Sequence, residues 1–238
     1  MKPFIFGSRS GIYIIDLEQT ERHLKAACDF LEDLTAKGQR VLFIGTKKQA
    51  KPILEGDAKR CGMPYVINRW LGGTLTNFQT IKVNIERLRE LRRQRADGFF
   101  ERISKKDAKR FSRQQERLEE SFSGVAEMDR VPGCLFVVDI KREEIAVREA
   151  NRLKIPIVAI CDTNADPELV TYPIPGNDDA IRSIQVIVSL MTESILAGRR
   201  RFEVAQAVVP VEPSAVEAIP QEVNAHVGPN HDAQKSQP

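Results

Sequence analysis

The sequence has few of the features that mark secreted, membrane-spanning or metal-binding proteins. Its 238 residues include four cysteines, which are widely separated and form no Cys-x-x-Cys pair: Cys28, Cys61, Cys134 and Cys161. Disulfide scaffolds and zinc ribbons need closer, paired cysteines, so we expect buried thiols and no bound metal. No apolar run approaches the roughly 20 residues of a bilayer span, so we expect no membrane segment. The first residues lack the apolar stretch of a signal peptide, which predicts a cytoplasmic protein.

Catalytic motifs are also missing. The segment GTKKQAK at residues 45–51 lacks the second glycine and the Lys-Ser/Thr pair of a P-loop, and no predicted strand is followed by G-x-G-x-x-G. G-x-S-x-G and H-E-x-x-H do not occur either. Two of the three histidines, His226 and His231, lie in a proline-rich C-terminal stretch without a helical or strand period. We therefore expect no catalytic residue, no cofactor and no small-molecule substrate.

Charge is divided unevenly along the chain. The formal net charge is +3, yet residues 203–238 carry −4 and residues 1–202 carry +7. A basic body favours a nucleic-acid partner. The proline-rich acidic segment cannot bury enough apolar surface to offset its ordering entropy, so residues 203–238 are predicted to form a disordered tail.

Short apolar runs alternate with amphipathic stretches through most of the body. The runs are rich in β-branched and aromatic residues and lie at residues 41–45, 65–67, 134–139 and 157–161. Runs of this kind are typical of parallel strands that are covered on both faces. Helical periods fill the intervals at residues 17–37, 47–61, 142–153 and 178–198. The alternation predicts an α/β fold with a doubly wound parallel sheet of the Rossmann or flavodoxin kind.

Residues 78–128 interrupt this alternation. They hold two long, charged helical patterns with narrow apolar seams on either side of a turn signal at residues 96–98. Such seams suit two antiparallel helices packed as a coiled-coil-like hairpin. We therefore predict three parts, namely an α/β sheet domain formed by residues 1–77 and 129–202, an inserted helical hairpin at 78–128, and the acidic tail at 203–238.

Polar residues follow the predicted strands, at the edge of the sheet where α/β proteins bind ligands. Thr46 and Lys47 follow the first strand, Asp139 a second and Asp162 a third. These four side chains could serve a nucleotide- or sugar-phosphate-handling enzyme, which is the alternative function. Small polar residues at strand ends more often cap helices and form turns.

The loop at residues 67–78 contains the only tryptophan, Trp70, beside Arg69 and a Gly-Gly pair. Arg69 can reach phosphate and sugar oxygens, and Trp70 can stack on a base. A lone tryptophan is usually highly buried, so an anchor on the core is an equal alternative for Trp70. Basic clusters elsewhere could contact phosphates, although charge runs on a helix are more often a solvated face. The clusters are Lys47-Lys48, Arg92-Arg93-x-Arg95, Lys105-Lys106-x-x-Lys109-Arg110 and Arg199-Arg200-Arg201.

Several long segments carry a resemblance to a known family. They are KPFIFGSRSGIYIIDLE at residues 2–18, FIGTKKQAK at 43–51, NRWLGGTLTNFQTIK at 68–82, PGCLFVVDIKREEI at 132–145, and residues 149–186. Together they resemble the bacterial and organellar type of small-subunit ribosomal protein two, from residue 2 to about 200. Family members usually begin some tens of residues earlier, so we expect the natural start to lie upstream of Met1.

The resemblance implies a structural constituent of the small ribosomal subunit that binds small-subunit, 16S-type rRNA and performs no reaction. It also implies neighbouring ribosomal proteins as partners, including the large mRNA-binding small-subunit protein one, in a cytoplasmic or organellar ribosome. The candidate rRNA contacts are Arg9, Lys47, Lys48, Arg69, Trp70, Arg92, Arg93, Arg95, Lys105, Lys106, Lys109 and Arg110.

Overall fold

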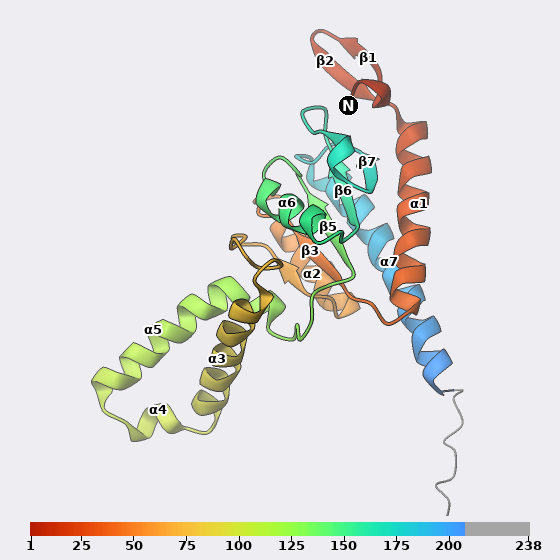
Figure 1. Ribbon diagram of the computed structural model, residues 1–238. Helices are drawn as coiled ribbons and strands as arrows, with labels where there is room; N and C mark the ends of the chain where they lie inside the picture. The colour runs from red at the N-terminus through yellow and green to blue at the C-terminus, as the bar shows by residue number, and fades with distance from the viewer. Residues whose placement is uncertain (208–238) are drawn as a thin grey trace, which may run out of the picture.

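A five-stranded parallel sheet forms the centre of the computed structural model, which describes residues 1–207 (Figure 1). The strand order is β4-β3-β5-β6-β7, and every neighbouring pair is parallel. The strands are β3 (Val41–Ile44), β4 (Tyr65–Val66), β5 (Cys134–Val138), β6 (Ile157–Cys161) and β7 (Tyr172–Pro175). The chain runs outward from β3 to β4 and then crosses β3 to reach β5, so the predicted doubly wound sheet is confirmed.

Burial on both faces explains why these segments form parallel strands. All residues of β3, β5 and β6 are buried, and their sequences are continuously apolar, without the alternation of a half-exposed sheet. β7 contains Pro173 and Pro175 and lies at the edge of the sheet, where a missing N–H donor is tolerated. These prolines are the reason why the sequence pattern predicts no strand there.

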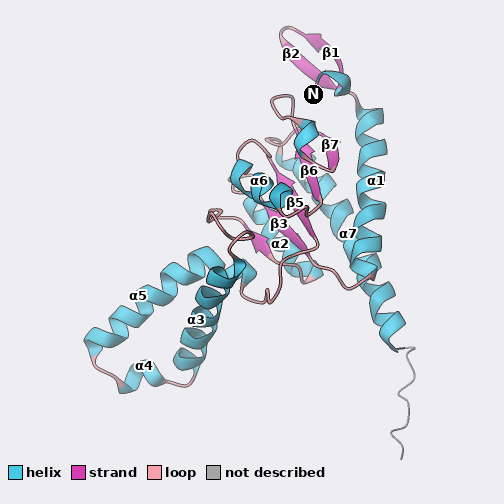
Figure 2. Cartoon of the chain, viewed as in Figure 1, coloured by secondary structure: helices cyan, strands magenta, loops and turns pink. Residues whose placement is uncertain are grey.

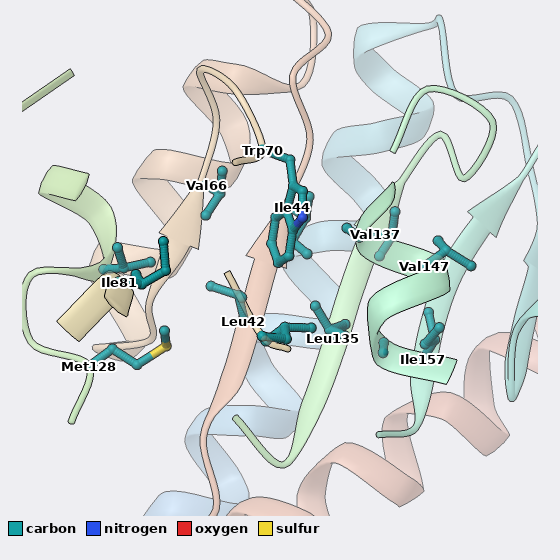
Figure 3. Packing of buried hydrophobic residues seen from close by; sticks show 14 of the residues in the cluster. Leu42, Ile44, Val66, Trp70, Ile81, Met128, Leu135, Val137, Val147 and Ile157 are labelled. Carbon is teal, nitrogen blue, oxygen red and sulfur yellow. The ribbon is translucent and has the colours of Figure 1, made fainter. Parts of the chain in front are cut away.

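Helices cover both faces of the sheet. They are α1 (Leu17–Ala36), α2 (Lys51–Cys61), α6 (Glu144–Arg152) and α7 (Ile181–Ala207). α1, α2 and α7 pack on one face, around Phe43 and Phe136. α6 packs on the other face, where Val147 lies beside Val137 and Ile157, and Trp70 covers Ile44 (Figure 3). The change of face between α2 and α6 accompanies the reversal of strand order between β3 and β5.

The residues between β4 and β5 form a helical hairpin that projects from the sheet (Figure 2). Its elements are α3 (Phe78–Ala96), α4 (Phe99–Arg102), α5 (Lys105–Phe122) and the 3-10 turn η2 (Ser123–Val125). The apolar seam of α3 is buried as its spacing predicts, at Ile81, Ile85, Leu88 and Leu91. The short helix α4 was not predicted. It begins after Gly98, whose positive φ of 69° ends α3 at the tip of the hairpin.

A second, smaller sheet lies at the N-terminus. After the 3-10 turn η1 (Lys2–Phe4), strands β1 (Ile5–Arg9) and β2 (Ile12–Ile15) pair antiparallel. The turn residues Ser10 and Gly11 both have positive φ, at 52° and 80°, as a tight two-residue hairpin turn requires. This hairpin was not predicted, because its apolar residues are not arranged as a buried core strand. Phe6, Ile12 and Tyr13 are exposed.

Helix α7 is longer than expected and runs to Ala207. The prediction of a disordered tail from residue 203 is therefore wrong for residues 203–207, and residues 208–238 lie outside the described part of the chain. Within residues 1–207, α7 is the one helix that is long and apolar enough, by length and composition, to cross a membrane. It was not expected from the sequence, because charged and polar residues interrupt its apolar residues. Core helices pass the same test, and α7 buries Ile184, Val188 and Met191 against the sheet and α1.

The four cysteines are free thiols. Cys61, Cys134 and Cys161 are buried and Cys28 is half-buried, so the expectation of buried thiols holds for three of the four. Burial raises the pKa of Cys61 to about 11 and that of Cys161 to about 12. Because the thiolate is the reactive form, these buried thiols have little nucleophilic character.

Candidate nucleic-acid interface

The carboxyl ends of β3, β4 and β5 meet at one edge of the sheet. Doubly wound sheets bind ligands where the strand order reverses, which here is between β3 and β5. Thr46 and Lys47 follow β3, Asn68 and Arg69 follow β4, and the segment 139–143 follows β5. This edge therefore brings together polar residues that follow three of the predicted strands.

Lys47 is the centre of an ion network at this edge. Its Nζ lies 2.9 Å from Oδ2 of Asp139, 2.6 Å from Oδ1 of Asp178 and 2.8 Å from Oδ1 of Asp179. An ammonium group has three N–H donors, so these carboxylates use all of them. The side chain of Lys47 is only 13% exposed. The predicted phosphate contact of Lys47 does not fit this geometry, because the charge is already neutralised inside the protein.

Three carboxylates share the one ammonium group, and this imbalance affects the pKa values of Lys47 and Asp178. Burial lowers the pKa of Lys47, but its hydrogen bonds to Asp178, Asp179 and Asp139 outweigh burial and raise it overall. Burial raises the pKa of Asp178 to about 6, against the hydrogen bond from Lys47 and with the help of the nearby Asp139 charge. As the pH falls, Asp178 therefore binds a proton at a higher pH than an ordinary aspartate does. Asp139 has a positive φ of 68°, a conformation that Asp tolerates better than most residues.

The same edge contains the four residues of the enzyme alternative, which the structure separates into two groups. Lys47 bonds Asp139, whereas Thr46 bonds Glu143. Asp162 lies with Asp178 and Asp179 in a cluster whose carboxylate oxygens are within 4.8 Å of one another, as a cation site would need. The Lys47 ammonium group already bonds Asp178 and Asp179 in that cluster. The protein's own cation thus lies against this cluster, although its single charge balances only one of the carboxylates.

On the other side of Thr46, an open pocket of about 400 Å³ lies between the ends of β3, β4 and β5. Glu143, which is 3% exposed, accepts hydrogen bonds from the backbone N–H of Thr46 at 2.9 Å and from its hydroxyl at 2.6 Å. Nε of Arg142 donates to the same hydroxyl oxygen at 2.7 Å. Arg69 lines the rim and is exposed. The guanidinium groups of Arg69 and Arg142 make no ion pair with any residue of 1–207.

Trp70 is part of the core. It is 7% exposed and packs with the residues under α6, as Figure 3 shows. Its indole Nε1 donates to Oε1 of Glu149 at 3.0 Å. The prediction that Trp70 stacks on a base is not compatible with this buried position, and the alternative of a core anchor is the one observed.

The basic residues of the hairpin fall into two groups. On α3, Arg92 is held in a bidentate ion pair with Glu119 of α5, with an Nε–Oε1 distance of 2.7 Å, and this pair lowers the pKa of Glu119. Arg95 reaches Gln115, and Arg93 is exposed. The four predicted bases on α5 are exposed and make no ion pair with any described residue: Lys105, Lys106, Lys109 and Arg110. The free positive charge of the hairpin is therefore concentrated on α5.

Two further bases extend this group. Arg113 and Arg117 line the same groove along α5 as Lys106, Lys109 and Arg110, and both are exposed. Their steps of three and four residues place them on one helix face. They were not predicted, because neither has a basic neighbour in the sequence; their helical spacing from Lys106, Lys109 and Arg110 is the signal that indicates them.

Comparison with known proteins identifies the family. The profile of the family described as Ribosomal protein S2 matches residues 1–198. This chain belongs to the ribosomal protein S2 family. The resemblance noted in the sequence is thereby confirmed.

Individual relatives agree along most of their length. The small ribosomal subunit protein uS2 of Syntrophobacter fumaroxidans is 50% identical over 221 residues, which cover 92% of this chain and 81% of the relative. The protein of the same name from Coprothermobacter proteolyticus is 48% identical, over 94% of this chain and 84% of the relative. The protein of the same name from Dictyoglomus turgidum is 53% identical, over 84% of this chain and 81% of the relative.

The remaining candidate contacts of this S2-family chain are on the sheet domain. Arg9 lies at the end of β1 and Lys48 directly follows Lys47, and both are exposed. Arg142 was not among the predicted contacts, although its place after β5 is the signal that could have indicated it. Exposed, unpaired bases are thus present on the N-terminal hairpin, on the sheet edge and on α5.

Proposed function

We propose that this protein is a structural constituent of the small ribosomal subunit that binds small-subunit rRNA and has no catalytic role. The observation that carries the proposal is the match to the ribosomal protein S2 family over residues 1–198, together with relatives named small ribosomal subunit proteins. The site is the ribosome, in the cytoplasm or its organellar equivalent. The neighbours are other small-subunit proteins, including the large mRNA-binding small-subunit protein one.

Binding rests on phosphate neutralisation by side chains that the protein leaves unpaired. Lys and Arg side chains that contact phosphates release condensed counterions, which gives affinity without sequence readout. The proposed contacts are the exposed bases of α5 together with Arg9, Lys48, Arg69 and Arg142. Arg93 and Arg95 of α3 are secondary members of this surface. Arg92 and Lys47 are occupied by carboxylates, so they position other groups instead.

The sheet domain and the hairpin have different roles in this proposal. In this proposal residues 1–77 and 129–202 form the sheet domain, and residues 78–128 form an arm that projects from it and presents exposed bases on α5. One buried cluster continues from the sheet into the apolar seam of α3 and supports the base of the arm. An arm of this kind can reach an RNA helix or a protein neighbour that the body does not touch. An enzyme on the same scaffold is disfavoured, because the Lys47 network fills the part of the strand-end crevice that would hold a phosphate.

Substitutions in the arm test the proposed function. Replacing Lys105, Lys106, Lys109 and Arg110 together by glutamine should weaken association with small-subunit rRNA and lower the slope of log affinity against log salt by about 3. A matched control replaces three lysines and one arginine on exposed positions of the sheet domain: Lys25, Lys37, Lys154 and Arg152. Binding titrations at several salt concentrations and co-sedimentation with small subunits provide the readouts.

The outcomes separate the parts of the proposal. A reduced slope for the α5 variant alone supports the arm as an RNA contact. Equal slopes for both variants and the wild-type protein would remove the arm from the RNA interface and leave it to a protein neighbour. If the wild-type protein fails to associate with small subunits, the proposed function itself is wrong.

A further inference from the structure

The open pocket beside Thr46 has no role in the network of Lys47 or in the helical arm. Its walls are Thr46, Asn68, Arg69, Arg142 and Glu143, with the edge of Trp70 and the exposed side chain of Ile145. It lies at the reversal of strand order, where doubly wound sheets hold nucleotides. Its volume of about 400 Å³ is within the usual range for sites that enclose a small organic group.

We propose that this pocket binds one unpaired nucleotide of the rRNA, with its base inside and its phosphate on the rim. The inference rests on the proposed function and adds a specific site to it. The chemical class is a nucleotide whose base carries an exocyclic amino group, which means adenine, cytosine or guanine.

The orientation follows from the charges. Arg69 and Arg142 lie at the rim, are exposed, and make no ion pair with residues 1–207, so they can donate to a phosphate. The carboxylate of Glu143 lies deeper and is almost fully buried. Oε1 of Glu143 accepts from Thr46, and no residue in the described part of the chain donates to Oε2. A carboxylate at this depth repels a phosphate and accepts from an amino group of a base.

Ile145 supplies the apolar contact. It is 56% exposed in the first turn of α6, although it is a large aliphatic side chain beside charged groups. The flat face of a base would cover it and remove apolar surface from water. Contact with a base thus accounts for an apolar side chain at this position, which packing in the protein core does not explain.

A nucleotide within an RNA chain fits the pocket better than a free nucleotide. Sites for free mononucleotides commonly hold the phosphates with a glycine-rich loop at a helix N-terminus, and residues 45–51 lack that pattern. Here the donors for a phosphate are long side chains on an open rim, which suits a ligand already held near the surface by other contacts along its chain.

The test uses exposed positions, so that folding is preserved. Small subunits lacking this protein are reconstituted with full-length wild-type protein, with Ile145→Asp, or with Leu153→Asp as a control at another exposed aliphatic residue, the C-cap at the opposite end of α6 from the pocket. Chemical probing then measures base reactivity along the rRNA. We expect at least one unpaired adenine, cytosine or guanine to be protected by the wild-type protein and to regain reactivity by about tenfold with Ile145→Asp but not with Leu153→Asp. Arg69→Ala combined with Arg142→Ala should have the same effect.

The results that would overturn the inference differ from those that would overturn the proposed function. If the wild-type protein binds rRNA but no protected base responds to the pocket variants, the pocket is not a nucleotide site and the ribosomal role stands. If the wild-type protein does not bind rRNA at all, the proposed function fails as well. Titration with free AMP, CMP and GMP should give no saturation. Saturable binding that Ile145→Asp abolishes, without any change in the rRNA footprint, would reassign the pocket to a free nucleotide.

Discussion

Trp70 and Glu149 are joined by a hydrogen bond of 3.0 Å between the indole Nε1 and the carboxylate Oε1, although 79 residues separate them in the sequence. Glu149 also accepts from the backbone N–H groups of Gly73, Leu75 and Thr76, at 2.8 to 3.0 Å. One buried carboxylate on α6 therefore fixes the loop after β4 and the entry of the chain into the helical arm. Burial alone raises the pKa of Glu149, but these hydrogen bonds outweigh burial and lower it.

Glu149→Gln should destabilise the protein by about 2 kcal/mol, because the new amide presents N–H groups to the N–H donors of the loop. Since the pKa of Glu149 is lowered by folding, its contribution is present above the ordinary value of 4.5 and is lost as the pH falls through the lowered pKa. Denaturant unfolding should therefore show that the difference between wild-type and variant shrinks below about pH 4. Glu144→Gln, on the exposed side of α6, is the control. Equal losses for both variants would contradict a special role for Glu149.

Lys47→Met should cost about 3 to 5 kcal/mol of unfolding free energy, since Asp139 and Asp178 would then be buried without a counterion. The folded fraction should keep the rRNA affinity of the wild-type protein, because the ammonium group faces the three carboxylates. Lys48→Met is the matched control. Lys48 is exposed, so its loss should change stability by less than about 0.5 kcal/mol. A stable Lys47→Met protein with weakened rRNA binding would restore Lys47 as a phosphate contact.

Asp178→Asn should change how stability depends on pH. The pKa of Asp178 is raised from 3.8 to about 6 in the folded protein, so its ionisation favours the unfolded state. The free energy of unfolding of the wild-type protein should therefore fall, relative to the variant, as the pH rises from about 4 to about 7, by about 3 kcal/mol at most. Urea titrations across this range measure the difference. Asp179→Asn, at a carboxylate that is 69% exposed, is the control, and the same pH profile for both variants would argue against an excess of buried negative charge.

Gly198→Ala should destabilise the crossing of α1 and α7. A Cβ atom at residue 198 would collide with the hydroxyl of Thr35 and the backbone carbonyl of Glu32. Alanine is the better helix former by about 1 kcal/mol, so a net loss of about 1 to 3 kcal/mol would show that helix packing outweighs propensity. Gly56→Ala on α2 is the matched control, because its Cβ would meet no atom within 4 Å and should stabilise the protein. Thermal unfolding of both variants gives the comparison, and a stabilised Gly198→Ala would contradict it.

The elements that were predicted correctly share a local cause. β3, β5 and β6 are continuous apolar runs and the seam of α3 has a clear helical period, so neighbouring residues were sufficient to indicate them. β7 was missed because its prolines are tolerated only at a sheet edge, which is a property of the assembled sheet. The β1–β2 hairpin was missed because it does not bury its apolar residues in the core.

The sequence by itself determined the doubly wound sheet, the inserted helices and the surplus of positive charge, because these depend on residue type and on spacing along the chain. Only the tertiary structure decided which charges are free. In the sequence, Lys47 and Arg92 resemble phosphate ligands, but in the fold they bond Asp178 and Glu119. Trp70 resembles a stacking residue, but in the fold it is buried and bonded to Glu149 of α6. Neither segment alone indicates an ion pair or a buried contact with a distant segment, because such contacts form only when the chain folds.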